Sequence, residues 1–297
     1  MKKCLLTLFL ILLALSLTAC QPAAPAAPAT PTTPATPAAP AAPANPVIRL
    51  STTTSVNDSG LLPYLQPAFE ADTGYTLEIT SAGSGAAIEK GRTGDADALL
   101  VHSKAAEETF VAEGFAPERI PFMYNYFVIV GPAEDPAGVG SAATATEAFR
   151  QIAAGGFDFI SRGDDSGTHN AEKKIWDAAG GTPDPAADSW YVSAGAGMGA
   201  CLNLAAEKQA YLLTDKATYL AHEARGQLTL LLERSDEMKN TYSVLLISPD
   251  KWPDTNIDGA TAFAEWITSE KALGLIAQYG IAEYGEALFF TDMTNPQ

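Results

Sequence analysis

Residues 161–170, with the sequence S-R-G-D-D-S-G-T-H-N, combine features that bind a small anion. They follow an apolar run (Phe157–Ile160) that predicts a strand, and they lead into a predicted helix (Asn170–Ala179). A strand that enters a helix through a glycine-rich turn leaves several backbone N–H groups pointing at one spot. Arg162 adds planar, bidentate hydrogen bonds to a tetrahedral oxyanion, which a lysine cannot reproduce. We therefore interpret this stretch as a candidate oxyanion site.

Three further junctions between a predicted strand and a predicted helix have a similar composition. They are T-T-T-S (Thr52–Ser55), A-G-S-G (Ala82–Gly85) and A-G-A-G-M (Ala194–Met198). One such turn is weak evidence, because Gly, Ser and Thr are common at helix entries. Four of them at corresponding strand ends favour one shared site. Arg162 is the only basic residue at these junctions, and its alternative role is an ion pair with a neighbouring aspartate.

An enzyme is the competing interpretation of the same stretch. Asp165-Ser166-Gly167 resembles the surroundings of a nucleophilic serine, and His169 follows closely. A triad needs a histidine that reaches the serine, however, and a residue three positions further in the first helical turn is poorly placed. Neither His102 nor His222 stands in a general-base context, and no ligand spacing indicates a metal site. The sequence therefore predicts a protein that is not an enzyme and has no cofactor or bound metal.

The segments that must position these residues alternate between strand and helix patterns, which predicts an α/β fold with parallel sheet. Two long apolar strands, 124–130 and 241–247, are predicted to connect two lobes as hinge strands. Lobe I is then 47–123 plus 248–297, and lobe II is 131–240. Open α/β sheets bind ligands at the carboxyl ends of their strands, so two facing lobes form a cleft. The predicted strands are Val47–Ser51, Tyr75–Thr80, Ala98–Val101, Tyr124–Val130, Phe157–Ile160, Trp190–Ser193, Ala210–Leu213, Leu228–Leu232 and Thr241–Ile247.

The N-terminus predicts export and lipidation. Residues 1–19 have a short basic start and an apolar run, and Leu17-Thr18-Ala19-Cys20 resembles a lipobox, so Cys20 is the predicted lipidated residue. The alternatives are an ordinary signal peptide or a membrane helix, but the run is shorter than the roughly 20 residues that span a bilayer. The Ala/Pro/Thr-rich segment that follows Cys20, up to residue 46, predicts an extended linker. We expect an extracytoplasmic, lipid-anchored monomer.

The net charge and the cysteine content exclude some classes of partner and describe the remaining cysteine. The chain has a net charge of −17, and without Lys2 and Lys3 it has 16 basic against 35 acidic residues. This charge argues against a nucleic-acid partner and against a polybasic membrane patch. Apart from Cys4 and Cys20, Cys201 is the remaining cysteine, and its apolar neighbours predict a buried side chain on a helix.

The combination of motifs resembles the tungstate-binding proteins of ABC importers. The matching stretches are T-T-T-S, A-G-S-G, G-D-A-D-A-L-L-V-H (Gly94–His102), S-R-G-D-D-S-G-T-H and L-T-D-K-A-T-Y-L (Leu213–Leu220). The resemblance spans nearly all of 47–297. It implies a two-lobed, type II periplasmic-binding-protein fold that takes up tungstate or molybdate and delivers it to a permease and its ATPase. It also implies a set of ligand-binding residues: Thr53, Thr54, Ser55, Ser84, Gly85, Arg162, Ser166, Gly167, Thr168 and Gly197.

Phosphate is the main alternative ligand, because Ser84 and Ser166-Gly167-Thr168 also resemble elements of phosphate-binding proteins. Phosphate carries a proton at neutral pH and needs an acceptor in its site, whereas tungstate and molybdate carry none. Asp97 and Asp165 are the candidate acceptors, and the sequence leaves their orientation open. We expect Asp97 to support the start of a strand and Asp165 to orient the turn or Arg162. A lipoprotein that senses or adheres without transport is a further alternative.

Overall fold

The computed structural model of the protein describes residues 43–293. The predicted signal peptide (1–19), the lipidated Cys20 and the linker up to residue 42 lie outside the described residues, as do residues 294–297. Within residues 43–293, no helix combines the length and the apolar character needed to cross a membrane.

Strands and helices alternate along the described chain, as the sequence predicts. The strands are β1 (Val47–Thr53), β2 (Thr76–Ala82), β3 (Ala98–Val101), β4 (Ile120–Gly131), β5 (Phe159–Ser161), β6 (Tyr191–Ser193), β7 (Tyr211–Asp215), β8 (Thr229–Leu232) and β9 (Lys239–Leu246). The α-helices are α1 (Thr54–Asp58), α2 (Leu61–Thr73), α3 (Ser84–Thr93), α4 (Lys104–Ala112), α5 (Ala145–Gly155), α6 (Gly167–Ala179), α7 (Met198–Lys208), α8 (Lys216–Ala221), α9 (Ile257–Ile267), α10 (Glu270–Gln278) and α11 (Ile281–Tyr284).

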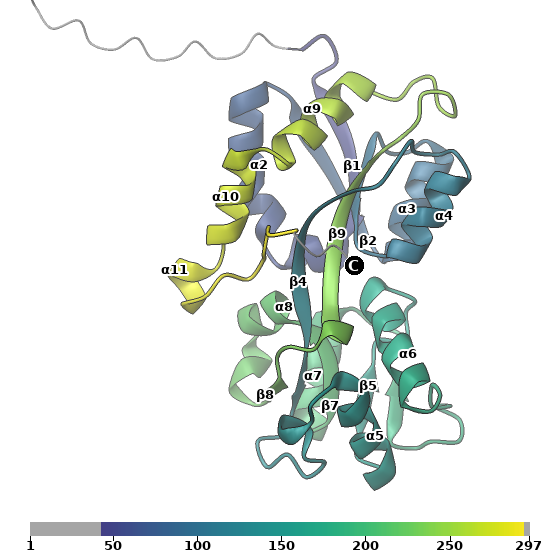
Figure 1. The fold of residues 1–297 in the computed structure, drawn as a ribbon, viewed down its shortest axis with the longest axis vertical. Helices are drawn as coiled ribbons and strands as arrows, with labels where there is room; N and C mark the ends of the chain where they lie inside the picture. Colours follow the sequence, from purple (N-terminus) through teal and green to yellow (C-terminus); the bar gives the residue numbers. More distant parts are fainter. Residues whose placement is uncertain (1–42, 294–297) are drawn as a thin grey trace, which may run out of the picture. The chain divides into compact units, whose positions relative to one another are not determined.

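The strands form a mixed sheet in the order β2-β1-β3-β9-β4-β7-β5-β6, with β8 paired to β4. Strands β1, β2 and β3 are parallel to one another, as are β5, β6 and β7. The first half of β4 pairs with β9, and its second half pairs with β7 and β8. Figure 1 shows β4 and β9 running between two helix-covered lobes. The predicted two-lobed α/β fold is therefore confirmed.

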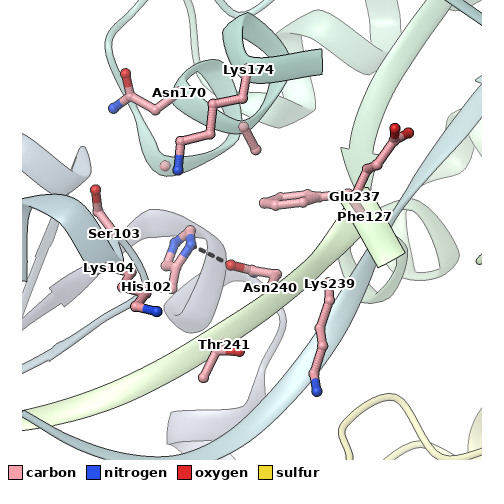
Figure 2. A pocket seen from close by; sticks show the side chains of 12 residues that line it. His102, Ser103, Lys104, Phe127, Asn170, Lys174, Glu237, Lys239, Asn240 and Thr241 are labelled. Carbon is pink, nitrogen blue, oxygen red and sulfur yellow. Dashed lines mark hydrogen bonds between the residues drawn. The ribbon is translucent and has the colours of Figure 1, made fainter. Parts of the chain in front are cut away.

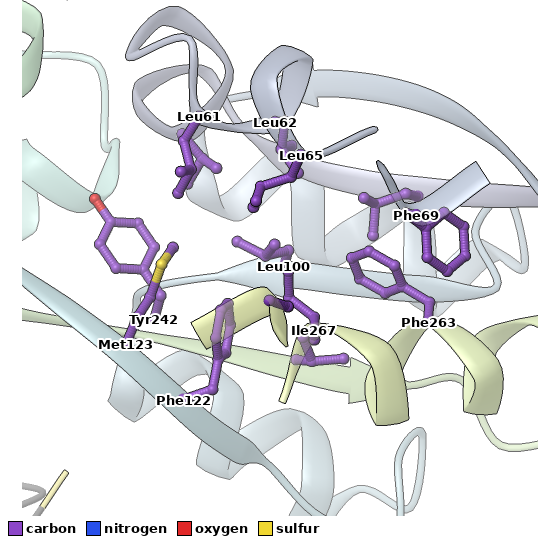
Figure 3. Close-up of a cluster of buried hydrophobic side chains, with 14 of the residues drawn as sticks. Leu61, Leu62, Leu65, Phe69, Leu100, Phe122, Met123, Tyr242, Phe263 and Ile267 are labelled. Atoms are coloured by element: carbon purple, nitrogen blue, oxygen red, sulfur yellow. The ribbon is translucent and has the colours of Figure 1, made fainter. Parts of the chain in front are cut away.

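Each lobe has its own apolar core. In the first lobe, side chains from β1, α2, β9 and α9 pack into one cluster, part of which is drawn in Figure 3. The second lobe is built around α5, β5, α6 and β7 on one face and around α7 on the other. Most of each core is packed within its own lobe, and Ala217 and Leu220 of α8 also pack against the first cluster.

The parallel strands of each lobe bring the predicted junctions to one edge of the sheet. β1 ends at Thr53, β2 at Ala82 and β3 at Val101, and in the second lobe β5 ends at Ser161. The helices α3 and α6 begin two to six residues after these ends. The sheet topology thus collects hydroxyl groups and helix N-termini from both lobes at the carboxyl ends of the strands.

Replacement of Phe69 tests how much the core of the first lobe contributes to the free energy of unfolding. The ring of Phe69 is fully buried and meets the rings of Phe263 and Trp266 edge-on at centroid distances of 5.5 Å. Phe69→Ala removes this packing and leaves a cavity, so we expect a loss of about 3–5 kcal/mol in the free energy of unfolding. Urea denaturation followed by circular dichroism measures it. Ile281→Ala, at a position 48% exposed, is the control and should change stability by about 0.5 kcal/mol or less; equal effects would contradict this description of the core.

Candidate anion-binding site

A small cavity lies among the strand ends of both lobes. It is lined by Thr53, Thr54, Ser55, Ala82, Gly83, Ser84, His102, Arg162, Ser166, Gly167 and Thr168. The space open to the centre of a water-sized sphere is about 10 Å³, so the cavity is far smaller than the roughly 300–1,000 Å³ of pockets for drug-sized ligands. Its size and its hydroxyl-rich lining suit a small polar ion.

The first lobe contributes hydroxyl groups from the end of β1 and the start of α3. The Oγ of Ser55 lies 3.1 Å from Thr53 Oγ1 and 3.0 Å from His102 Nε2. Ser84 is the first residue of α3, and its buried Oγ has no hydrogen-bond partner among the described residues. Because an unpaired buried hydroxyl is costly, Ser84 is suited to donate to a ligand in the cavity.

The second lobe contributes the N-terminus of α6. Ser166 is the N-cap residue, and its Oγ accepts a hydrogen bond of 3.3 Å from the backbone N–H of His169. The ring of His169 is engaged elsewhere, because its Nδ1 accepts from the backbone N–H of Asp165 at 3.0 Å. Among the described residues, no hydrogen bond joins the His169 ring to the Ser166 hydroxyl, so the ring is not placed as a general base for Ser166. The second lobe presents the positive end of a thirteen-residue helix to the cavity instead.

Arg162 is buried, with 2% of its surface exposed. Its Nε donates to the carbonyl oxygen of Ala196 at 2.8 Å, and its Nη2 donates to the carboxylate of Asp164. Nη1 makes no hydrogen bond to any described residue, and Arg162 lines the cavity. The guanidinium is thus held from one side by a carbonyl and a carboxylate.

The fourth predicted junction supports this arginine. Ala196 accepts from Arg162 through its carbonyl and donates to the Arg162 carbonyl through its N–H. Gly197 is the N-cap residue of α7, but neither Gly197 nor Gly85 is among the residues that line the cavity. Their roles as ligand-binding residues stay predictions.

The two aspartates that the sequence left open both point away from the cavity. Burial alone would raise the pKa of Asp97, but hydrogen bonds from the Arg49 side chain and from the backbone N–H groups of Arg49 and Asn256 outweigh it and lower this pKa. The side chain of Asp165 is 83% exposed and accepts from Lys173 Nζ at 2.8 Å, which lowers the pKa of that carboxyl. Among residues 43–293, no Asp or Glu lines the cavity.

Of the two roles expected for Asp165, orienting the turn or Arg162, the support of Arg162 belongs to Asp164 instead. Asp164 holds the guanidinium and also accepts from the Ser166 N–H at 3.2 Å. Asp165 has a left-handed backbone conformation (φ 54°), which asparagine and aspartate tolerate better than most residues. This turn directs the two neighbouring carboxylates to different sides of the loop.

Gly167 lies in close contact with the first lobe beside the cavity. A Cβ atom on this residue would lie 2.4 Å from His102 Cε1 and 2.8 Å from Ser84 Oγ. Both distances are far below van der Waals contact, so a side chain at this position would require His102 and Ser84 to shift or the two lobes to separate. Glycine is required here for space.

Three lining residues, Ala82, Gly83 and His102, are absent from the predicted ligand-binding set, and His102 is the one with a polar side chain. It directly follows β3, and its Nδ1 lies 2.8 Å from Asn240 Oδ1 on β9, as Figure 2 shows. Burial lowers the pKa of His102 to about 4, and nearby Arg162 contributes in the same direction, against the hydrogen bond to Asn240. The ring is therefore neutral near pH 7. Its position after a buried strand, at the same edge as Thr53, is the signal that could have identified it.

Two further features of the described residues concern the single thiol and metal-binding side chains. Cys201 is fully buried on α7, as predicted, and burial raises the pKa of its thiol to about 11. Within residues 43–293, no group of three or more His, Cys, Asp and Glu could hold a metal ion.

The fold and the cavity define a two-lobed α/β protein that is built to enclose a small anion. A family model described as "PBP superfamily domain" matches residues 33–271, and the chain belongs to this family. The chain is 48% identical to the tungstate-binding protein TupA of Peptoclostridium acidaminophilum over 244 residues. These aligned residues make up 82% of this chain and 84% of that protein. It is 39% identical to TupA of Campylobacter jejuni, over 76% of this chain and 84% of the relative.

Solved structures agree with this assignment. The tungstate-binding protein TupA from Desulfovibrio alaskensis G20 matches with a TM-score of 0.73 and 42% identity, over 82% of this chain and 98% of that one. A structure described as the tungstate ABC transporter from Geobacter sulfurreducens matches with a TM-score of 0.72 and 41% identity, over 78% of this chain and 98% of that one.

Asp97→Asn tests the structural role of Asp97. The amide cannot satisfy all the donors that converge on the carboxylate, so we expect a loss of roughly 1.5–3 kcal/mol in unfolding free energy at pH 7. Because the folded-state pKa is lowered from 3.8, this contribution is present above pH 3.8 and is lost as the pH falls through the folded-state value. Urea denaturation at several pH values measures the difference. The exposed Asp254→Asn is the control, and a constant difference at all pH values would contradict the assignment.

Proposed function

We propose that the chain is an extracytoplasmic solute-binding protein that captures tungstate between its lobes and delivers it to the permease and ATPase of an ABC importer. The observation that carries the proposal is the lining of the cavity. It offers hydroxyl and backbone N–H donors and one buried arginine, and among the described residues it contains no carboxylate. Such a site favours an unprotonated oxyanion over hydrogen phosphate, whose proton needs an acceptor.

The relatives support the choice of ligand, because they are named tungstate-binding proteins and cover most of the chain. Molybdate has the same charge and tetrahedral shape, so the same donors accommodate it. The N-termini of α3 and α6, each with about half a positive charge, and the guanidinium of Arg162, which is also paired with Asp164, contribute positive charge toward a dianion. We propose as ligand-binding residues Thr53, Thr54, Ser55, Ser84, Gly85, Arg162, Ser166, Gly167, Thr168 and Gly197.

The remaining parts of the proposal concern the anchor and the motion. A signal peptide (1–19), a lipid on Cys20 and the following linker would hold a monomeric body outside the cell membrane. Lobe I (47–123 plus 248–297) and lobe II (131–240) would close over the anion by bending at 124–130 and 241–247. This arrangement accounts for the ligand donors being divided between two separately packed cores.

Arg162→Lys tests the ligand and its main cation together. A ligand that binds the folded state raises stability by RT ln(1+[L]/Kd), so tungstate and molybdate should raise the Tm of the wild type, and phosphate should not.

A lysine in place of Arg162 loses the planar donor set, and we expect the tungstate Kd to rise at least about tenfold. Isothermal titration measures it, with Arg150→Lys, on the exposed face of α5, as the control. A Tm shift with phosphate alone would reject tungstate, and an unchanged Kd would assign Arg162 a purely structural role.

Gly167→Ala tests whether the lobes must meet for binding. The added methyl group would collide with His102 and Ser84, so closure should be blocked and the tungstate Kd should rise at least about tenfold, with little loss of thermal stability in the free protein. Gly274→Ala, where a Cβ meets nothing within 4 Å, is the matched control. If both alanines bind tungstate as tightly as the wild type does, the contact at Gly167 is not needed for capture.

A further inference from the structure

A chain of buried hydrogen bonds leads from the anion cavity across both connecting strands. Ser55 contacts His102, His102 contacts Asn240 on β9, Asn240 contacts Asn125 on β4, and Asn125 contacts Asp215 at the end of β7. All five residues are buried. The chain therefore connects a hydroxyl that lines the cavity to a carboxylate in the second lobe, through groups that are shielded from water.

The direction of every hydrogen bond in this chain follows from Asp215. Its Oδ1 accepts from the N–H and hydroxyl of Thr218, and its Oδ2 accepts from Asn125 Nδ2, so both oxygens are acceptors although burial raises the pKa of this carboxyl. Asn125 must then present its Nδ2 to Asp215 and its Oδ1 to Asn240. Asn240 donates through Nδ2 to Asn125 and to Tyr242 Oη, which leaves its Oδ1 for the histidine ring.

This direction fixes the tautomer of neutral His102. Because Asn240 offers an oxygen, His102 Nδ1 must carry the proton, and Nε2 is left as an acceptor. Ser55 then donates its only hydroxyl proton to Nε2 at 3.0 Å. With its proton used in this way, Ser55 has none left to donate to an oxyanion in the cavity, and its oxygen accepts from Thr53, whose Oγ1 lies 3.1 Å away.

Protonation of His102 reverses the role of Ser55. An imidazolium donates from both nitrogens, so Nδ1 keeps its bond to Asn240 and Nε2 donates to Ser55 Oγ. The hydroxyl proton of Ser55 is then free to point at the anion. The imidazolium also places a second full positive charge beside the cavity, where Arg162 is the only Lys or Arg among the described lining residues.

The surroundings of His102 allow this proton to enter and leave. His102 and Gly167 also line a second, larger cavity, whose charged members are Lys104, Lys174, Glu237 and Lys239. Figure 2 shows Lys104 beside His102 on one side of this cavity and Lys174 on the other. The phenol ring of Tyr242 packs against the imidazole of His102, with the two ring centroids 4.9 Å apart. Arg162 faces the same imidazole from the second lobe. The second cavity gives the ring a connection to solvent that bypasses the anion.

We infer that the protein takes up one proton together with each dianion, and that His102 holds this proton and turns Ser55 into a donor for the anion. The inference rests on the proposed function, because it describes the same site. His102 acts here as a proton-linked positioning residue. It gives the site a preference for fully charged oxyanions, since each bound dianion supplies the negative charge that retains the proton.

The sign of the pH dependence follows from linkage. In the anion-free protein the pKa of His102 is about 4, and a bound dianion raises it. Between the free and the bound pKa, binding takes up close to one proton, so the Kd should rise about tenfold for each pH unit of increase. Above the bound pKa the dependence ends, because neither state holds the proton.

The test is calorimetric titration of sodium tungstate into the wild type in two or more buffers of different ionisation enthalpy, all at about pH 5, one unit above the pKa of His102 in the free protein. The dependence of the measured heat on the buffer gives the number of protons taken up, and we expect a value approaching one. NMR of the three histidine rings is an independent readout, in which His102 should change to an imidazolium spectrum on addition of tungstate.

Three variants assign the proton. His102→Gln keeps a donor toward Ser55 without a titratable group, so proton uptake should vanish and the Kd should become independent of pH. His222→Gln removes a histidine whose Nδ1 accepts from the Ala224 N–H, away from both cavities. Glu172→Gln removes the buried carboxyl on α6 whose pKa is raised by burial to about 7. Both of these variants should retain the uptake of the wild type.

Several results would overturn the inference. Tungstate binding by the wild type without proton uptake would do so while leaving the proposed function intact. Uptake that persists in His102→Gln, or that disappears in Glu172→Gln, would assign the proton elsewhere. The wild-type calorimetry and NMR decide the matter even if His102→Gln fails to fold. Failure of the wild type to bind any oxyanion would reject the proposed function and this inference together.

Discussion

The contact between Gly167 and the first lobe is the constraint on which the site depends. The backbone of this residue lies so close to His102 and Ser84 that no side chain fits between them. Because of this approach, the hydroxyls at the end of β1 and the start of α3 share one cavity with Arg162 and the N-terminus of α6. The donors come from two separately packed cores, so their distance is set at this contact and not by either lobe alone.

An acidic protein can bind an anion if the carboxylates near the binding site are paired with cations and point away from the cavity. Three aspartates near the strand ends each have a cationic partner: Asp97 pairs with Arg49, Asp164 with Arg162 and Asp165 with Lys173. None of the three lines the cavity. Their charges fix loops and strand ends, while the buried hydroxyls, N–H groups and one guanidinium face the enclosed space. The large net negative charge of the chain is therefore compatible with a locally positive site.

The fold and most of the site could be predicted because apolar runs and glycine-rich turns are local signals. They located all nine predicted strands, with ends displaced by a few residues, and three of the four junctions meet in the cavity. Sequence spacing could not tell that the fourth junction supports Arg162 through Ala196, because lining and supporting turns have the same composition. It also could not tell which of Asp164 and Asp165 pairs with Arg162, because the directions of the two side chains depend on the left-handed backbone conformation of Asp165. His102 was missed because a single histidine after an apolar strand resembles a core residue.

The pairing of β4 with β9 has a mechanical consequence for the connection between the lobes. The two strands are hydrogen-bonded to each other from Ile120 to Tyr126 and from Lys239 to Val244, and Phe290 pairs with Tyr124. The connection is therefore a ribbon and not two independent tethers. A two-stranded ribbon twists readily but resists sliding of one strand past the other, since sliding breaks the whole ladder. Closure of the lobes as proposed would therefore be a twist of this ribbon and not a sliding of its strands.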